Sequence, residues 1–416
     1  MEELKYEPLG KYIDVITDYH SNGSYESLKK NVTLLDQKDY AIIIRTLNFE
    51  RDDFTDDLLY VDKSAFDFLA KSEVHPDDIL MNKIANPGSV YIMPDLNYPV
   101  TCGMNLFLIR FDGRVNQKYM YYNMKNVEDY IKSFGHGTTT KTITKDDVKG
   151  ISVYIHSKPA QDKIADLLTT IDRVIEINKK LTSNLEKAIK LIYNYWFVQF
   201  DFPDGTGRPY KSSGGSMIYD PRVHREIPQN WHVRSLKDVF EFERGIEVGS
   251  DNYYSEPTEK SSLFIRVSDM NSVSDIYTDT ELLNGKFLSP EDICVSFDGT
   301  VGKVDYGLNG GYSTGIRKIY DKNNQINNAV IYAIFKSDYI QYVIEKFATG
   351  SNILHASEAI NHMDLPFDDK IMEEYQKIIT PLFDKMLDAK MQNDRLTRTK
   401  KWLLPMLMNG QIEVRV

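Results

Sequence analysis

The stretch IIIRTLNF, Ile42 to Phe49, returns 221 positions later as LFIRVSDM, Leu263 to Met270. Other blocks recur at a distance of about 214 residues. They are Pro76 to Ile79 with Pro290 to Ile293, Gly88 with Gly302, Gly137 with Gly350, and Gln161, Ile164, Asn178 and Leu181 with Gln376, Ile379, Asn393 and Leu396. A period of 20 to 50 residues would indicate a solenoid. A period of half the chain predicts two copies of one domain, each followed by a helix, with pseudo-twofold symmetry.

Length and composition agree with this organisation. The chain has 416 residues, 42% of them apolar and 27% charged, which suits two ordinary globular domains. No apolar run approaches the roughly 20 residues needed to span a membrane, and residues 1–30 lack a basic start followed by an apolar core. We therefore expect a cytoplasmic protein without a membrane partner. Cys102 and Cys294 occupy unmatched places in the repeat, which predicts two buried, reduced thiols and no disulfide or zinc site.

The pattern along the chain predicts an α+β protein with five segments. Residues 1–157 and 232–367 mix β-rich runs with Gly, Pro and Asn turns, as expected for two mixed α/β domains. Residues 158–200 carry apolar positions at 4, 3 spacing from Ile164 to Trp196, a heptad seam that predicts a rod of roughly 58 Å. Residues 368–416 contain the second helix, from about Asp369 to Met408, in which Pro405 should kink or fray the last turn. Both long helices carry the apolar seam that is typical of a coiled coil.

An asparagine lies at the same place on each helical seam. Asn178 comes fourteen residues after Ile164, and Asn393 comes fourteen after Ile379. An Asn on such a seam costs stability but fixes register. Two surface residues beside the stripe are the alternative. Their paired placement favours a role in helix register.

Residues 201–231 form a Pro/Gly-rich linker with a recognisable sequence. The chain contains Gln161-x-Lys-Ile-Ala, Trp196-Phe-Val, Phe202-Pro, Gly207-Arg-Pro-Tyr-Lys-Ser-Ser-Gly-Gly and Ile227-Pro-Gln-Asn-Trp. This succession resembles the specificity subunits of type I restriction-modification systems over essentially the whole chain. In that family two target-recognition domains alternate with two helical regions.

The resemblance implies a DNA-reading adaptor. Each domain would read one half of a bipartite site in double-stranded DNA, and unlike domains predict an asymmetric site. The two helices would pack antiparallel as a coiled-coil spacer. They would also be a docking surface for DNA methyltransferase (modification) subunits, two copies in our interpretation, with restriction or translocase subunits as further partners. S-adenosylmethionine, ATP and Mg²⁺ would belong to those partners, and this chain would hold no cofactor. A rod of this length can hold two readers about 34 Å, one DNA turn, apart.

The charge is unusual for a DNA-binding protein. The net charge is −11 and the pI near 5.3, whereas affinity for DNA rests on basic side chains. Residues 50–78 carry ten acids and three bases, but residues 79–158 carry ten bases and six acids. The second domain has one small basic stretch at Lys303, Arg317 and Lys318. We expect partner subunits to supply part of the phosphate binding, and the chain alone to bind DNA weakly.

Polar, Gly-rich segments are the candidate DNA-reading elements, since such side chains address base edges or phosphates and Gly permits close approach. They are residues 82–89, 135–145, 297–303, 309–318 and 349–352, although plain surface turns have the same composition. Arg45 and Arg266 recur in the repeat, and either DNA contact or an ion pair with a nearby acid explains them. The candidate residues are Arg45, Lys83, Asn86, Ser89, Thr139, Lys141, Lys145, Arg266, Lys303, Tyr312, Ser313, Arg317, Ser351 and Asn352.

Catalytic motifs are absent from the sequence. The nearest string to an NPPY methyltransferase motif is Asn86-Pro87-Gly88-Ser89, which lacks the aromatic residue that would stack on a flipped base. No GxxxxGK[ST] loop occurs, and no GxGxxG follows a strand. Asp77 and Asp78, like Glu291 and Asp292, precede an apolar run, where capping is a better explanation than Mg²⁺ binding. We predict no catalytic or metal site. The alternatives are a coiled-coil adaptor that does not read DNA and a specificity subunit of a methylation-only system.

Overall fold

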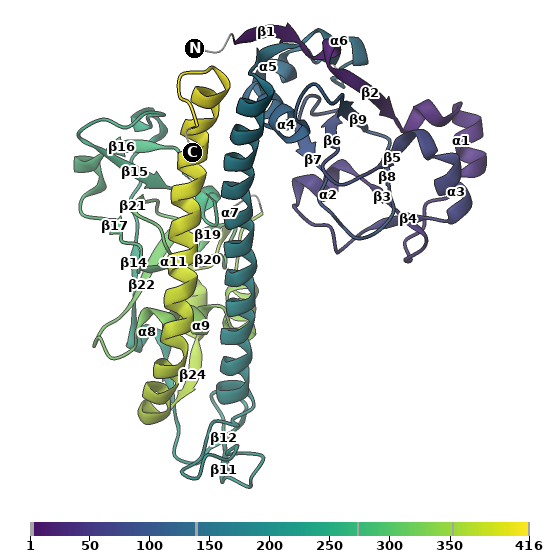
Figure 1. Ribbon diagram of the computed structural model, residues 1–416. Helices are drawn as coiled ribbons and strands as arrows, with labels where there is room; N and C mark the ends of the chain where they lie inside the picture. Colours follow the sequence, from purple (N-terminus) through teal and green to yellow (C-terminus); the bar gives the residue numbers. More distant parts are fainter. Residues whose placement is uncertain (1–3, 138–139, 273, 352, 415–416) are drawn as a thin grey trace. The chain divides into compact units, whose positions relative to one another are not determined.

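The computed structural model describes residues 4–137, 140–272, 274–351 and 353–414. The chain forms two compact units. The first unit holds residues 1–173 and 397–416, and the second holds residues 174–396. Each unit contains one α/β domain, the first or second domain below, with parts of the two long helices α7 and α11 (Figure 1).

The first domain is built on two four-stranded sheets, ordered β2-β9-β6-β7 and β4-β3-β8-β5. Strands β3 and β8 pair in parallel, and the other neighbours are antiparallel. A separate antiparallel pair joins β1 to β10. The strands are β1 Lys5–Pro8, β2 Ile13–Asp18, β3 Ala41–Ile44, β4 Leu59–Val61, β5 Glu73–Val74, β6 Ile79–Asn82, β7 Val90–Ile92, β8 Val100–Cys102, β9 Leu106–Phe111 and β10 Ser152–Ile155.

The second domain repeats this topology. Its sheets are ordered β14-β22-β18-β20 and β16-β15-β21-β17, with β15 and β21 parallel, and β13 pairs with β24. Shorter pairs join β11 to β12 and β19 to β23. The strands are β11 Met217–Asp220, β12 Arg225–Pro228, β13 His232–Ser235, β14 Phe240–Arg244, β15 Ser261–Ile265, β16 Tyr277–Asp279, β17 Phe287–Leu288, β18 Ile293–Ser296, β19 Asp298–Gly299, β20 Val304–Asp305, β21 Gly310–Tyr312, β22 Ile316–Asp321, β23 Leu354–His355 and β24 Asp364–Phe367.

Short helices complete both domains. The α-helices of the first are α1 Tyr25–Asn31, α2 Thr46–Glu50, α3 Lys63–Phe68, α4 Gln117–Asn126, α5 Glu128–Ser133 and α6 Lys145–Gly150, and those of the second are α8 Leu236–Val239, α9 Asn328–Phe335 and α10 Asp338–Lys346. The 3-10 helices are Leu9–Lys11, Tyr19–Asn22, Ala70–Ser72, Ser250–Asn252, Val267–Asp269, Thr280–Leu283 and Ser357–His362. In both domains the helix that follows the last long strand, α4 or α9, begins at an asparagine cap. The predicted duplication of one fold is therefore confirmed at the level of strand order.

The long helices are α7, Lys158–Tyr193, and α11, Asp369–Met408. A π-helical turn, Asn194–Val198, extends α7 and buries Trp196. Pro405 does not end α11, because loss of one ladder hydrogen bond is tolerated this close to the terminus. Gly410, with φ of 69°, follows the helix in the left-handed conformation that favours glycine.

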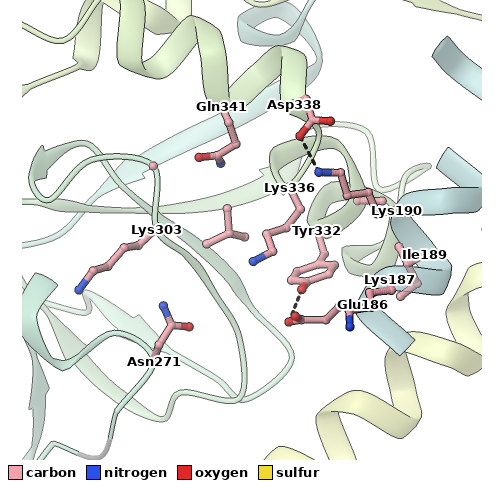
Figure 2. A pocket seen from close by; sticks show the side chains of 13 residues that line it. Glu186, Lys187, Ile189, Lys190, Asn271, Lys303, Tyr332, Lys336, Asp338 and Gln341 are labelled. Carbon is pink, nitrogen blue, oxygen red and sulfur yellow. Dashed lines mark hydrogen bonds and ion pairs between the residues drawn. The ribbon is translucent and has the colours of Figure 1, made fainter. Parts of the chain in front are cut away.

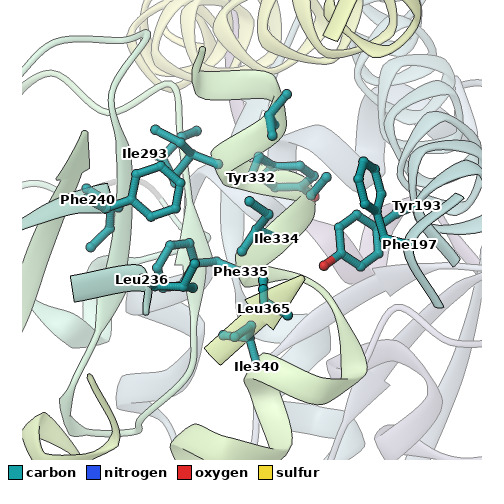
Figure 3. Close-up of a cluster of buried hydrophobic side chains, with 14 of the residues drawn as sticks. Tyr193, Phe197, Leu236, Phe240, Ile293, Tyr332, Ile334, Phe335, Ile340 and Leu365 are labelled. Atoms are coloured by element: carbon teal, nitrogen blue, oxygen red, sulfur yellow. The ribbon is translucent and has the colours of Figure 1, made fainter. Parts of the chain in front are cut away.

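Each unit has its own apolar core. In the first, Ile109, Tyr119 and Leu168 are fully buried in one cluster. In the second, Phe240 and Phe335 pack in a cluster with Tyr193 and Phe197 from the end of α7 (Figure 3). Burial of a large apolar side chain contributes about 1.5–3 kcal/mol, so α7 is held to the second domain largely by such contacts. Cys102 and Cys294 are free and buried, as predicted.

The linker between the helix and the second domain follows a fixed path. Phe202 stacks on Tyr210, with ring centroids 4.8 Å apart, and on Trp231, at 5.1 Å. Asp201 accepts hydrogen bonds from the backbone and hydroxyl of Ser212, both 2.7 Å long. Stacking and capping therefore order a segment rich in proline and glycine. Within the part of the chain that the structure describes, no helix is long and apolar enough to cross a membrane.

Candidate nucleic-acid interface

The two domains are joined to their long helices by the same hydrogen bond. In the first unit, Gln161 of α7 accepts from the backbone N–H of Asn116, the cap of α4, at 2.8 Å. In the second unit, Gln376 of α11 accepts from the N–H of Asn327, the cap of α9, also at 2.8 Å. These two glutamines were identified as part of the sequence repeat. The sequence alone did not show that each one bonds its long helix to the cap of a domain helix.

The repeated acidic residues before β6 and β18 close turns and pair with a neighbouring strand. Asp78 accepts from the N–H of His75 at 2.7 Å and from Arg110 at 2.6 and 2.7 Å. Asp292 accepts from the N–H of Ser289 at 2.7 Å and lies 2.7 Å from Lys318. Capping, rather than metal binding, accounts for their position. Among the described residues, no group of three or more His, Cys, Asp or Glu side chains is placed to hold a metal ion.

Arg45 and Arg266 each form an ion pair with a nearby aspartate. Each precedes a short helix whose third residue, Asn48 or Asp269, accepts a hydrogen bond from the arginine backbone N–H, at 3.0 and 2.9 Å. The guanidinium of Arg266 donates to both oxygens of Asp269, at 2.9 and 2.8 Å. Arg45 lies 3.3 Å from a carboxylate oxygen of Asp57. Both guanidinium groups thus lie beside an acidic side chain, and DNA contact by either arginine stays a prediction.

Two other candidate cations are buried. Lys83 is 8% exposed and donates to Asp18 at 2.5 Å, while Lys145 lies 3.6 Å from the same carboxylate. Burial by itself would raise the pKa of Asp18, but hydrogen bonds from Lys83 and Ser21 lower it to about 2. In the second domain Arg317 is 5% exposed, and burial lowers its pKa. Lys83 and Arg317 therefore have little contact with solvent.

The remaining candidates divide by exposure. Tyr312 is fully buried in β21, a correction to its expected position on a reading loop, since Gly310 and Gly311 let this strand lie directly against Leu263 and Leu283. Ser89 and Ser313 are also buried. Asn86, Lys141 and Ser351 are exposed, while Lys145 and Lys303 are partly exposed. Thr139 and Asn352 lie outside the described residues. Direct DNA contact stays a prediction for the exposed residues.

A tight hairpin recurs in the two domains. In the first, His136 and Thr142 bond to one another through both backbone groups, at 2.8 Å each, and in the second Thr349 and His355 do the same, at 3.0 and 2.7 Å. Gly137 and Gly350 follow the first strand with φ of 114° and 118°. A Cβ on either would lie 2.6 or 2.1 Å from a carbonyl oxygen, so glycine is required at both places. Each domain therefore has a hairpin closed by the same pair of backbone hydrogen bonds and a matching glycine, with different sequence in the two domains.

The two seam asparagines meet in the second unit. Asn178 is 8% exposed and donates to the side-chain oxygens of Gln392, at 2.7 Å, and Asn393, at 3.0 Å. Asn393 donates to the carbonyl of Ile175 at 3.1 Å. Further along, the rings of Tyr193 and Tyr375 lie 6.3 Å apart, so α7 and α11 run antiparallel in this unit. The asparagines lie at the seam rather than on the outer surface, and their effect on helix register stays a prediction.

A duplicated α/β domain, each copy attached to a long helix and presenting its own hairpin, defines a class of two-domain recognition proteins. The chain belongs to the family of type I restriction modification DNA specificity domains, which matches residues 22–187 and 228–382. The resemblance inferred from the sequence is confirmed.

Individual relatives support this membership. The chain is 23% identical over 325 residues to the type I restriction enzyme MjaIX specificity subunit of Methanocaldococcus jannaschii, covering 74% of this chain and 71% of that protein. It is 23% identical over 418 residues to the type I restriction enzyme HindI specificity subunit of Haemophilus influenzae, covering 82% and 88%. The crystal structure of a type I restriction-modification system S subunit from M. genitalium shares the fold, with a TM-score of 0.58 at 16% identity, over 98% of this chain and 96% of that one.

Proposed function

We propose that this chain reads DNA for a type I restriction-modification complex, and that each domain reads one half of a bipartite, asymmetric site. The observation that carries the proposal is the pair of equivalent hairpins on two copies of one fold. A shared scaffold gives both domains the same way of approaching a duplex. Different hairpin side chains then read different bases.

The hairpins differ in chemistry. The first exposes Thr140 and Lys141, and the second exposes Ser351 and Ile353. Lysine and threonine donate hydrogen bonds to base edges or phosphates, whereas an aliphatic side chain suits contact with a thymine methyl group. Such unlike hairpins do not favour the same half-site, which is why we propose an asymmetric target.

We further propose that the long helices dock DNA methyltransferase subunits, two in number. Large apolar side chains are exposed along both helices, and their exposed fractions are 55% for Ile177, 70% for Leu191, 43% for Ile378 and 58% for Trp402. Exposed apolar residues of this size commonly mark interaction surfaces, and tryptophan is a frequent anchor in them. Restriction or translocase subunits would join through the same complex.

The chemistry would belong to the partners. S-adenosylmethionine, ATP and Mg²⁺ are assigned to the other subunits, and this chain would act as a non-catalytic recognition subunit. The net charge of −11 adds a second role for the partners, because binding a polyanion requires more cationic surface than an acidic chain provides.

Equilibrium DNA binding by the assembled complex tests the proposal. The complex with methyltransferase subunits should prefer one duplex sequence and lose affinity steeply with salt, whereas the methyltransferase alone should show no preference. A complex that forms but binds all duplexes equally would favour an adaptor that does not read DNA.

A further inference from the structure

The second unit contains a cavity of about 400 Å³ between α7 and the second domain. Its wall comes from α7, from residues 302–304 and from the junction of α9 and α10 (Figure 2). Ile189, Val304, Tyr332 and Ala333 form a buried apolar floor. The lining above this floor is charged.

Lysines outnumber acids in this lining. Lys187, Lys190, Lys303 and Lys336 face two carboxylates, Glu186 and Asp338. The second domain as a whole has the opposite balance, since residues 232–367 contain twelve lysines and arginines and twenty aspartates and glutamates, a net charge of −8. The cavity is thus a local site of positive charge in an acidic domain.

Both carboxylates already have partners. Asp338 is paired with Lys190 at 2.5 Å, and Glu186 accepts a hydrogen bond from the hydroxyl of Tyr332 at 2.7 Å (Figure 2). Burial, with a further contribution from Glu186, raises the pKa of Tyr332 far above its ordinary value, so this hydroxyl stays a donor. Asp338 is thus neutralised by Lys190, whereas Glu186 is hydrogen-bonded but keeps its charge, so three lysines remain against one carboxylate.

Lys336 and Lys187 are left available. Within the described part of the chain neither forms an ion pair. Lys336 extends its amine into the space between Asn271 and Tyr332, over the Tyr332 ring and 5.9 Å from its centroid (Figure 2). The amine of Lys303, at the margin, donates to the carbonyl of Val267 at 3.2 Å. An excess of ammonium groups in a partly enclosed site favours an anion from outside.

The first domain has a lysine at the position that corresponds to Lys336, and there the lysine is ion-paired. Lys125 and Lys336 each lie nine residues after the asparagine that caps α4 or α9. Lys125 is paired with Glu128, the first residue of α5, which also lies 2.7 Å from Lys132. In the second domain the corresponding acid, Asp338, pairs with α7 instead. The lysine that is ion-paired in the first domain forms no ion pair with a described residue in the second.

We propose that this cavity binds a phosphate group of the DNA backbone, with Lys336 as the principal contact and Lys187 as the second. A phosphate is a compact anion with several acceptor oxygens, which suits two lysine ammonium groups and the amide of Asn271 at the cavity edge. Such a contact would hold the second domain on the duplex without reading sequence, and it offers an acidic domain one strong anchoring point. The inference rests on the proposed function.

The test uses the complex assembled with methyltransferase subunits and a duplex containing its site. The double variant Lys187→Ala with Lys336→Ala is compared with a matched control, Lys63→Ala with Lys377→Ala, which removes two exposed lysines that are paired with Asp67 and Glu373. Binding is measured from 50 to 200 mM salt. Loss of one phosphate contact should reduce the slope of log K against log salt by about 0.9, so that affinity falls about 3.5-fold less over this range, while the control keeps the parental slope.

Each result has one meaning. An unchanged slope in the double variant, with site preference intact in the parent complex, overturns the phosphate site and leaves the proposed function standing. Absence of site preference in the parent complex contradicts the proposed function itself. Loss of methyltransferase from the double variant in a pull-down overturns the inference in favour of a protein partner at this cavity. Where the double variant unfolds, Lys336→Gln should reduce the slope and Lys336→Arg should retain it.

Discussion

The two domains share a strand order, but their buried cations have different partners. In the first, Lys83 and Asp18 form a buried ion pair at 2.5 Å. In the second, Arg317 donates to the carbonyl of Thr314 at 2.5 Å and to the hydroxyl of Ser357 at 3.1 Å, with the Asp298 carboxylate 4.0 Å away. The duplicated fold has therefore not kept its internal electrostatics. We expect the first domain to be the more sensitive to the loss of one charge.

The largest effect should follow from changing the helices while leaving both domains intact. Deletion of seven residues, one heptad, from each of α7 and α11 should shorten the gap between the half-sites without changing the bases read, because a heptad preserves the seam. Binding to the original site should then be lost and a more closely spaced site should be bound. Selection from a duplex library with randomised spacing measures this. An unchanged gap would refute the spacer role.

The substitution Asp18→Asn should destabilise the first domain more than a comparable change destabilises the second. Removing the carboxylate leaves Lys83 buried without its partner, which costs about 3 kcal/mol or more in the free energy of unfolding. The change Asp298→Asn beside Arg317 in the second domain should cost clearly less, because Arg317 keeps its carbonyl and hydroxyl acceptors and the other partner of Asp298, His355, is exposed. Urea unfolding followed by hydrogen exchange in each domain compares them, and equal losses would contradict the comparison.

The same pair predicts a pH dependence. The folded pKa of Asp18, about 2, lies below the ordinary value near 3.9, so its contribution is complete above about pH 4. That stability is lost as the pH falls from about 4 to 2. The Asp18→Asn variant should show a weaker acid transition of the first domain than the parent chain in a pH titration of hydrogen exchange.

The hydrogen bonds of Gln161 and Gln376 to the helix caps should differ about twofold in their contribution to the free energy of unfolding. Gln161 is 1% exposed and also donates to the carbonyl of His156 at 2.8 Å, whereas Gln376 is only half-buried. We expect Gln161→Ala to lower the free energy of unfolding by about 2 kcal/mol and Gln376→Ala by about 1 kcal/mol. Chemical denaturation of the two single variants measures the difference. A larger loss of unfolding free energy from Gln376→Ala than from Gln161→Ala would contradict this prediction.

The smallest effect should come from Glu128→Gln, which frees Lys125 and Lys132 while leaving an oxygen to accept from the N–H of Val90. The first domain then resembles the second at this junction. The slope of log K against log salt for the assembled complex should steepen by at most about 0.9. An unchanged slope would show that this junction faces away from DNA.

The sequence predicted the features that depend on period and repeat. The bounds of α11 and the placement of Asn178 and Asn393 on the helical seams follow from heptad spacing, which is a local property, whereas the contact between the two asparagines does not. The choice between DNA contact and an ion pair at Arg45 and Arg266 was left open, because it depends on where the partner acid folds. Asp269 is three residues from its arginine, but Asp57 is twelve residues from Arg45.

Burial and cavity formation were harder to predict. Residues 309–318 have the composition of a polar loop, yet Gly310 and Gly311 form part of β21, and Tyr312 enters the core. Lys336 belongs to no motif and follows the apolar helix α9. Its availability depends on Asp338 pairing with Lys190 of α7, a contact between residues 148 positions apart. Tertiary packing of this kind has no periodic signal.

The most direct test of the account is methylation mapping by single-molecule sequencing of DNA from cells that express this chain together with methyltransferase subunits, with a control lacking this chain and a pull-down that demonstrates assembly. We predict a split, asymmetric motif carrying methylated adenine that appears only when this chain is present. The absence of any chain-dependent motif from cells in which the complex forms would contradict sequence reading by the two domains.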